Sequence, residues 1–81
     1  MNNTDENFIN WFAGRLKQMR NDEGMTQKEF AESCGIGSAT YERLEQGRFS
    51  PRVSTCLLIA RQLGISLSTL YSGFEDADNG I

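Results

Sequence analysis

The stretch TQKEFAESCGIGSATYERLEQG, residues 26–47, predicts two short helices joined by a glycine-containing turn. Thr26 and Glu29 have the spacing of a capping box, in which each side chain accepts a hydrogen bond from a backbone amide at the helix start. The first helix is expected over 27–34 and the second over 38–46, and a glycine follows each of them. The other predicted helices lie before and after these two in the sequence.

The flanking sequence predicts three further helices, over 8–23, 52–63 and 67–72. In each of them apolar residues recur every three or four positions, as on one face of an amphipathic helix. No long segment alternates with the period of two that is typical of a strand. We therefore expect an all-α fold, a compact five-helix bundle that forms one domain over residues 8–74.

Charge is unevenly distributed along the chain. The 81 residues include 8 Lys and Arg and 11 Asp and Glu, and the net charge of −3 argues against nucleic acid as a partner. Five of the acidic residues lie in 1–7 and 75–81, which we expect to be acidic flexible N-terminal and C-terminal tails. The domain between them has eight basic and six acidic residues, so it is mildly basic.

Residues that carry chemistry are few. Cys34 and Cys56 lack the spacing of metal ligands and the chain has no His, so we expect reduced core cysteines and no metal or cofactor. We find no nucleophile beside a base and no phosphate-binding Gly-rich loop, so an enzyme is not expected. The polar N-terminus is no secretory signal and no apolar run approaches the ~20 residues that span a bilayer, which predicts a cytoplasmic protein without a membrane partner.

The outward face of the helix expected over 38–46 contains no large apolar residue. It consists of Ser38, Ala39, Glu42 and Arg43. The small residues at the helix start permit close approach to a base edge, while Glu42 can accept from cytosine N4 and Arg43 can donate to guanine. A merely solvated polar face is the alternative.

Two charged residues are expected on the inward side of their helices. Glu45 shares its face with Tyr41 and Leu44, and Arg20 lies at nearly the same angle as Ile9 on the helix over 8–23. An inward Arg and an inward Glu are costly alone and tolerable as a hydrogen-bonded pair. We therefore predict that Arg20 pairs with Glu45.

Hydrogen-bond donors cluster around the two central helices, where phosphates could be bound. The candidate phosphate-binding residues are Thr26, Gln27, Gln46, Arg48, Phe49 and Arg52. Phe49 is a candidate by packing against a sugar–phosphate strand, and the alternative is that it covers the edge of the core.

From about Phe12 to Tyr71 the sequence resembles the XRE/Cro family of helix-turn-helix proteins, which includes the lambdoid phage repressors. The residues that carry the resemblance in register are Gln27, Ala31, Gly35, Leu44, Glu45, Gly47 and Pro51. The resemblance implies a lambda-repressor-like domain and a sequence-specific, DNA-binding transcriptional regulator, repressor-type, that binds a palindromic operator as a homodimer. Tyr41 departs from the pattern, because the family prefers a β-branched aliphatic residue there.

The same resemblance implies roles for individual residues. Positions 38, 39, 42 and 43 match the family's base contacts, with the helix over 38–46 in the major groove of double-stranded DNA. Gln27, Gln46 and Arg48 match backbone contacts, and Arg20 and Glu45 match an internal ion pair.

A second copy is the expected partner, because one module covers only ~600–1,000 Å² on DNA. Trp11, Leu58, Phe74 and Ile81 are predicted to be exposed apolar residues, and we expect the interface among them. Isolated surface hydrophobes or capping contacts are the alternative for this set. The alternative function is an antitoxin-like or anti-repressor-like module that binds another protein through Trp11 and its acidic tails, with DNA binding secondary.

Overall fold

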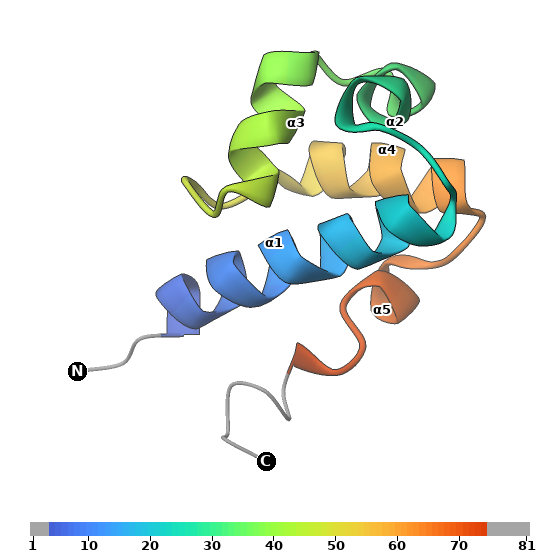
Figure 1. Cartoon of the computed structure of the whole chain (residues 1–81). Coiled ribbons are helices and arrows are strands. Elements are labelled where there is room, and N and C mark those ends of the chain that lie inside the picture. The colour runs from blue at the N-terminus through green and yellow to red at the C-terminus, as the bar shows by residue number, and fades with distance from the viewer. Residues whose placement is uncertain (1–3, 75–81) are drawn as a thin grey trace.

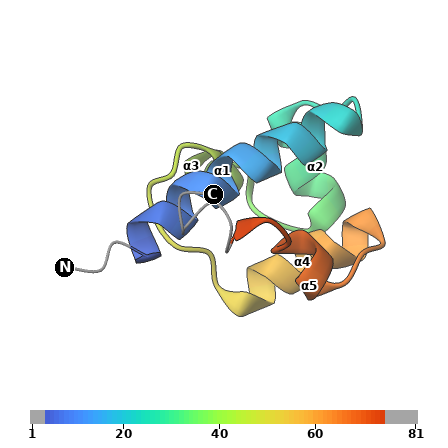
Figure 2. The same cartoon turned by 90° about the horizontal axis from the view of Figure 1, so that it is seen from below.

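Five helices and no strands make up the part of the chain that the computed structural model describes, residues 4–74. They are α1 (Thr4–Asp22), α2 (Gln27–Cys34), α3 (Ser38–Glu45), α4 (Val53–Leu63) and α5 (Leu67–Leu70). In Figure 1, α2 and α3 lie above α1 and α5 lies below it, while α4 runs beside α1 in the view of Figure 2. The all-α, five-helix architecture expected from the apolar spacing is confirmed.

The first helix is longer than predicted. α1 begins at Thr4, four residues before the expected start at residue 8, so residues 4–7 of the predicted tail are helical. The acidic residues Asp5 and Glu6 lie in its first turn, where carboxylates interact favourably with the helix dipole. Residues 1–3, together with the predicted C-terminal tail over 75–81 and its apolar residue Ile81, lie outside the described residues.

The last helix is shorter than predicted. α5 ends at Leu70 rather than at residue 72, because the chain turns at Tyr71 and reaches a positive φ of 95° at Gly73. Ser66 caps α5 as the sequence indicated, accepting a hydrogen bond from the amide of Thr69 at 3.1 Å. The turn brings the segment after α5 back toward α1.

The core lies between the inward faces of all five helices. Its fully buried side chains are Phe12, Leu16, Phe30, Tyr41, Leu44, Cys56, Ile59 and Leu70. Phe30 of α2 and Tyr41 of α3 join these two helices with ring centroids 5.4 Å apart. Cys34 and Cys56 are free and buried, and burial raises the pKa of both thiols, so they act as small apolar core residues.

An aromatic cluster ties the start of α1 to the segment after α5. The rings of Trp11 and Phe74 are 5.5 Å apart, and Phe8 contacts Phe74 at 5.1 Å and Trp11 at 6.2 Å. Both Trp11 and Phe74 are half-buried. The expectation that both are exposed is wrong, because Trp11 packs against Phe12 of the core and Phe74 packs against Trp11 and Phe8, as in the capping alternative.

At Gly47, just after α3, both the backbone angle φ and the space around the Cα atom favour glycine. Its φ is +70°, and a Cβ there would lie 3.2 Å from Asn10 Oδ1 and 3.8 Å from Ile9 Cγ2. Gly24 has a similar φ of +68°, but a Cβ there would have no neighbouring atom within 4 Å. The end of α3 therefore approaches α1 more closely than a side chain readily allows.

We expect Gly47→Ala and Gly24→Ala each to lose about 1–2 kcal/mol of unfolding free energy, because both force an L-residue into the left-handed region. Gly47→Ala is expected to lose more, because Asn10 must also move. Urea denaturation of both variants measures the difference. Equal losses would show that the contact between Gly47 and α1 is not tight.

Candidate nucleic-acid interface

The two faces of α3 are divided as the sequence predicted. Tyr41, Leu44 and Glu45 are buried. Ala39, Glu42 and Arg43 are exposed and Ser38 is half-buried at the margin. Within residues 4–74, the side chains of Glu42 and Arg43 have no hydrogen-bond or ion-pair partner. The outward face of α3 is therefore available for a ligand.

The buried carboxylate of Glu45 fixes α3 to α1 and α2. Arg20 of α1 donates from Nε to Oε2 at 2.6 Å and from Nη2 to Oε1 at 3.0 Å. Gln27 of α2 donates from Nε2 to Oε1 at 3.1 Å, and the Tyr41 hydroxyl donates to Oε2. Each carboxylate oxygen thus accepts two hydrogen bonds, and the expected pairing of Arg20 with Glu45 is bidentate.

Arg20 also reaches the connection between α1 and α2. Its Nη1 donates to the carbonyl oxygen of Met25 at 3.0 Å, one residue before the N-cap Thr26. One guanidinium group therefore holds the end of α1, the start of α2 and, through Glu45, the body of α3.

The network keeps Glu45 ionised. Burial opposes the charged form, but hydrogen bonds from Arg20, Tyr41 and Gln27 together outweigh it, so the pKa of Glu45 lies below its ordinary value. The hydrogen bond with Glu45 raises the pKa of Arg20. Burial, together with the neighbouring carboxylate, raises the pKa of Tyr41, so its hydroxyl remains a donor.

The first group of predicted phosphate-binding residues stands at the start of α2. Thr26 forms the capping box: its hydroxyl accepts from the amide of Glu29 at 3.1 Å, and its own amide donates to Glu29 Oε1 at 2.8 Å. Gln27 is half-buried and its amide group is bound to Glu45. Because that amide has two N–H groups, one of them is left for a second acceptor.

The second group lies beyond the end of α3. Arg48 Nε donates to Gln46 Oε1 at 2.7 Å, and both side chains are exposed. Arg52 is the N-cap residue of α4 and is also exposed. Phe49 is 37% exposed, so part of its ring surface stays open to solvent beyond the edge of the core.

Two contacts of this site were not predicted from the sequence. Helical phase placed Tyr41 inward, but nothing in the sequence indicated that its hydroxyl would reach Glu45 in the same helix. The bond from Gln27 to Glu45 was missed for a similar reason, because it depends on the angle between α2 and α3. The separation of four residues between Tyr41 and Glu45 was the available signal, since such residues are neighbours on a helix surface.

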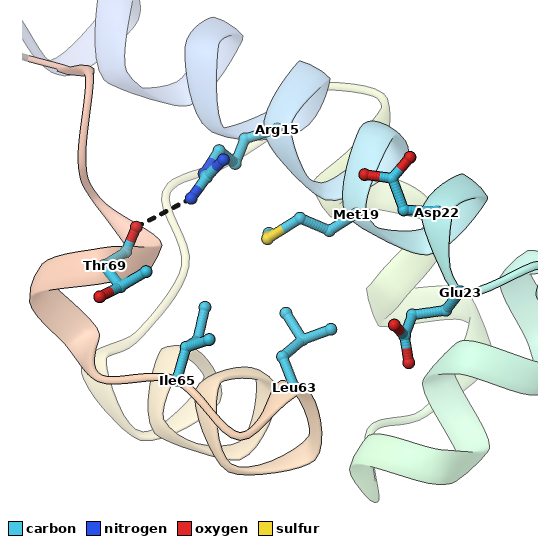
Figure 3. A pocket seen from close by; sticks show the side chains of 7 residues that line it. All are labelled: Arg15, Met19, Asp22, Glu23, Leu63, Ile65 and Thr69. Atoms are coloured by element: carbon cyan, nitrogen blue, oxygen red, sulfur yellow. Dashed lines mark hydrogen bonds between the residues drawn. The ribbon is translucent and has the colours of Figure 1, made fainter.

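A pocket of about 220 Å³ lies between α1 and the α4–α5 connection (Figure 3). Met19, Leu63 and Ile65 supply its apolar lining. Arg15 spans one side, donating to the carbonyl oxygens of Leu70 and Thr69 at 3.0 and 2.8 Å. The pocket is smaller than the ~300–1,000 Å³ of most ligand sites. Arg15 is engaged there in binding the carbonyl oxygens at the end of α5. Residues 4–74 contain no group of acidic, Cys or His side chains suited to hold a metal ion.

A capped α2, a short glycine-containing turn and an α3 with a free polar face define a helix-turn-helix protein. The helix-turn-helix family model HTH_3 matches residues 16–70. The chain therefore belongs to the XRE/lambda-repressor-like helix-turn-helix family, whose members are DNA-binding transcriptional regulators.

The chain is similar to regulators from bacteria and an archaeon. It is 33% identical over 64 residues to the HTH-type transcriptional regulator PuuR of Escherichia coli, covering 79% of this chain and 35% of that protein. It is 30% identical over 64 residues to the cryptic phage CTXphi transcriptional repressor RstR of Vibrio cholerae, covering 79% and 58%. An uncharacterised HTH-type regulator of Archaeoglobus fulgidus is 31% identical over 64 residues, covering 79% and 90%.

The chain thus spans about a third of the E. coli regulator and somewhat more than half of the phage repressor. No solved structure matches it significantly. None of the helices described here has the length and apolar character needed to cross a membrane.

The Arg20–Glu45 pair is expected to show strong energetic coupling. Arg20→Ala should cost about 3 kcal/mol of unfolding free energy, because it leaves the Glu45 carboxylate, 1% exposed, without its cation. A double-mutant cycle with Glu45→Ala should give a coupling energy of about 1 kcal/mol or more. Lys17→Ala, an exposed residue of the same helix, is the control and should be additive with Glu45→Ala. Additivity of the Arg20 pair would contradict the assignment.

The Tyr41 hydroxyl is expected to stabilise the fold in a pH-dependent way. Because the pKa of Glu45 is lowered by folding, its stabilisation is present above the ordinary carboxyl pKa of about 4.3 and is lost as pH falls through the folded pKa. Tyr41→Phe should therefore lose about 1.5 kcal/mol at pH 7, the value of a hydrogen bond to a charged group, and less in acid.

Urea denaturation of the wild type and Tyr41→Phe between pH 7 and pH 3 measures this difference. In a Glu45→Gln background the same substitution should cost less and should not depend on pH in this range. A constant loss at every pH in the wild-type background would show that the ring's packing, not its hydroxyl, is responsible.

Proposed function

We propose that this protein is a sequence-specific transcriptional regulator of repressor type that acts in the cytoplasm. It binds a palindromic operator as a homodimer and inserts α3 of each copy into the major groove. The observation that carries the proposal is the contrast between the two faces of α3: one is fixed by Glu45, and the other exposes Glu42 and Arg43 without partners among residues 4–74. A rigidly held helix with free polar side chains suits direct readout of bases.

The residues of the outward face of α3 have different roles in recognising the bases. Ser38 and Ala39 are small and let the start of α3 approach the base edges, Arg43 donates to guanine and Glu42 accepts from cytosine. Phosphates are contacted by Thr26, Gln27, Gln46, Arg48 and Arg52. These phosphate contacts position the helix, and the α3 side chains supply the sequence preference.

The free N–H of Gln27 gives the phosphate contacts a specific geometry. Its amide group is held by Glu45 at the start of α2, so a phosphate bound there is placed relative to α3 through the same carboxylate. Gln46 and Arg48 are already hydrogen-bonded to each other directly after Glu45, the last residue of α3. Both groups therefore adjoin the C-terminal end of the helix that reads the bases.

A purely protein-binding role finds less support in the structure. That alternative depended on the acidic tails and on an exposed Trp11. The Trp11 ring is half-buried and contacts Phe8, Phe12 and Phe74. The exposed side chains of Glu42 and Arg43 on α3, which lack partners among residues 4–74, favour DNA binding instead.

We expect Arg43→Ala to weaken binding to the preferred site by about 1–3 kcal/mol and to relax the preference at one base pair of each half-site. Selection of bound sequences from random DNA identifies the site, and titration of single-base variants measures the preference. The spacing between half-sites from the same selection tests the palindrome, which should place their centres one helical turn apart.

Arg48→Ala is the matched control, since it removes a neighbouring cation outside α3. It should weaken binding to all sequences alike and lower the salt-dependence slope by about 1. If Arg43→Ala also weakened every sequence equally, Arg43 would be a phosphate contact. Selection that recovers no preferred sequence would overturn the proposal.

A further inference from the structure

The pocket between α1 and the α4–α5 connection, which we call the α1 pocket, lies away from the helix proposed to read the bases. In Figure 1, α5 lies on the opposite side of α1 from α3. The volume of the α1 pocket is about 220 Å³. An apolar cavity of ~150 Å³ is large enough to bind benzene. The α1 pocket therefore has room for one large apolar side chain.

The floor of the α1 pocket is apolar. Met19 of α1 faces Leu63, at the end of α4, and Ile65, just after it (Figure 3). Leu63 and Ile65 are half-buried, so part of each side chain is open to solvent. A methionine thioether is flexible and polarizable, and it adapts to apolar groups of different shapes. Covering this floor with an apolar group would remove apolar area from water and favour binding.

The two ends of the α1 pocket carry opposite charges. Arg15, Met19 and Asp22 are spaced i, i+4 and i+7, so they share one face of α1. Figure 3 shows Arg15 at one end of the pocket and Asp22 and Glu23 at the other. A rise of 1.5 Å per residue places the backbone atoms of Arg15 and Asp22 about 10 Å apart along the helix.

Both charged ends have hydrogen-bonding capacity left for a ligand. The side chains of Asp22 and Glu23 are exposed and have no hydrogen-bond or ion-pair partner within residues 4–74. Arg15 uses its Nε and Nη2 for the carbonyl oxygens after α1, but its Nη1 has no partner among the same residues. The α1 pocket can therefore bind a cation at the carboxylates and an anion at Arg15.

The distance between the charged ends favours a peptide segment over a free amino acid. The ammonium and carboxylate groups of a free amino acid are attached to the same carbon atom, so they are much closer together than the two ends. An extended chain advances about 3.3 Å per residue, so residues three apart span about 10 Å. An extended segment along α1 can thus reach both ends at once.

Two other occupants match the charges of the α1 pocket less well. DNA phosphates would be repelled by the carboxylates of Asp22 and Glu23. Residues 75–81 of this chain contain three acidic residues and no Lys or Arg, so they lack the cation that these carboxylates would bind.

We propose that the α1 pocket binds an extended segment of a partner protein. The segment places one leucine-sized apolar side chain on the floor of the pocket, a Lys or Arg at Asp22 and Glu23, and an acidic residue at Arg15. The inference does not rest on the proposed DNA binding. It adds a second surface, through which a partner protein binds while α3 occupies DNA.

Titration of the ¹⁵N-labelled full chain with capped tetrapeptides, followed by nuclear magnetic resonance, tests the proposal. The probes are Asp-Leu-Gly-Lys and its reverse, Lys-Gly-Leu-Asp, which together cover both chain directions. At least one of them should shift the backbone amide signals of Met19, Leu63 and Ile65. Replacing its Lys by Glu should raise the dissociation constant about fivefold, the upper range for an exposed ion pair. Replacing its Leu by Ser should raise it about tenfold, because the apolar contact is lost.

A charge-reversed variant tests which residues select the cation. Asp22→Lys combined with Glu23→Lys should invert the preference, so that the peptide with Glu binds about fivefold more tightly than the peptide with Lys. Glu6→Lys combined with Glu32→Lys is the matched control. It makes the same change in net charge at exposed residues outside the α1 pocket and should keep the original preference.

Three results would overturn the proposal. The first is the absence of any shift in the pocket amides at about 10 mM peptide, which would mean a dissociation constant well above 1 mM. The second is equal affinity of the wild type for the Lys and Glu peptides. The third is a shift of the same amides when the concentration of the chain alone is raised, because the occupant would then be a second copy.

Repeating the titration with duplex DNA bound separates the α1 pocket from the proposed function. The capped probes have no net charge, so the dissociation constant should stay within about twofold when DNA is present. Displacement of the peptide by DNA would contradict binding of both partners at once. If no preferred DNA sequence exists, the proposed function fails while the peptide result without DNA still decides the role of the α1 pocket.

Discussion

The orientation of α3 depends on the carboxylate of Glu45. It is buried, ionised and surrounded by donors from three helices, with Arg20 on α1, Gln27 on α2 and Tyr41 on α3 itself. A buried carboxylate with fewer partners would oppose folding, because desolvation of an ion is costly. Because Glu45 accepts four hydrogen bonds, the orientation of α3 that satisfies all four is much more stable than alternative orientations of this helix.

The same carboxylate connects the interior of the protein to its proposed DNA-binding surface. The Gln27 amide group is held at the start of α2 by one N–H, and its other N–H remains for an acceptor outside the chain. In the proposed mode of binding, the position of a phosphate at α2 and the orientation of α3 therefore depend on the same carboxylate. A substitution at Tyr41 would therefore alter both the proposed phosphate contact of Gln27 and the proposed base contacts of α3, although Tyr41 itself is fully buried.

Periodicity predicted those parts of the structure that follow from helical phase, and only those. The pairing of Arg20 with Glu45 could be predicted because both residues lie on inward faces. The hydrogen bond from the Tyr41 hydroxyl to Glu45 could not, because it depends on the position that the Tyr41 ring takes within the core. Trp11 lies opposite the apolar stripe of the expected helix, and the sequence did not indicate that Phe74, after α5, would pack against it. The start of α1 was placed too late because Asp5 and Glu6 look like tail charges, although they form its first turn. Local composition cannot distinguish an acidic tail from an acidic helix start.

The net charge of −3 is compatible with DNA binding because charges act over short distances. At physiological salt the screening length is about 8 Å, so a phosphate responds to nearby side chains rather than to the whole chain. Residues 46–74 have only basic charges, and the acidic residues lie before or after that segment. In the proposed mode of binding, the negative net charge keeps binding to random DNA weak, and the base contacts of α3 supply the discrimination between sites.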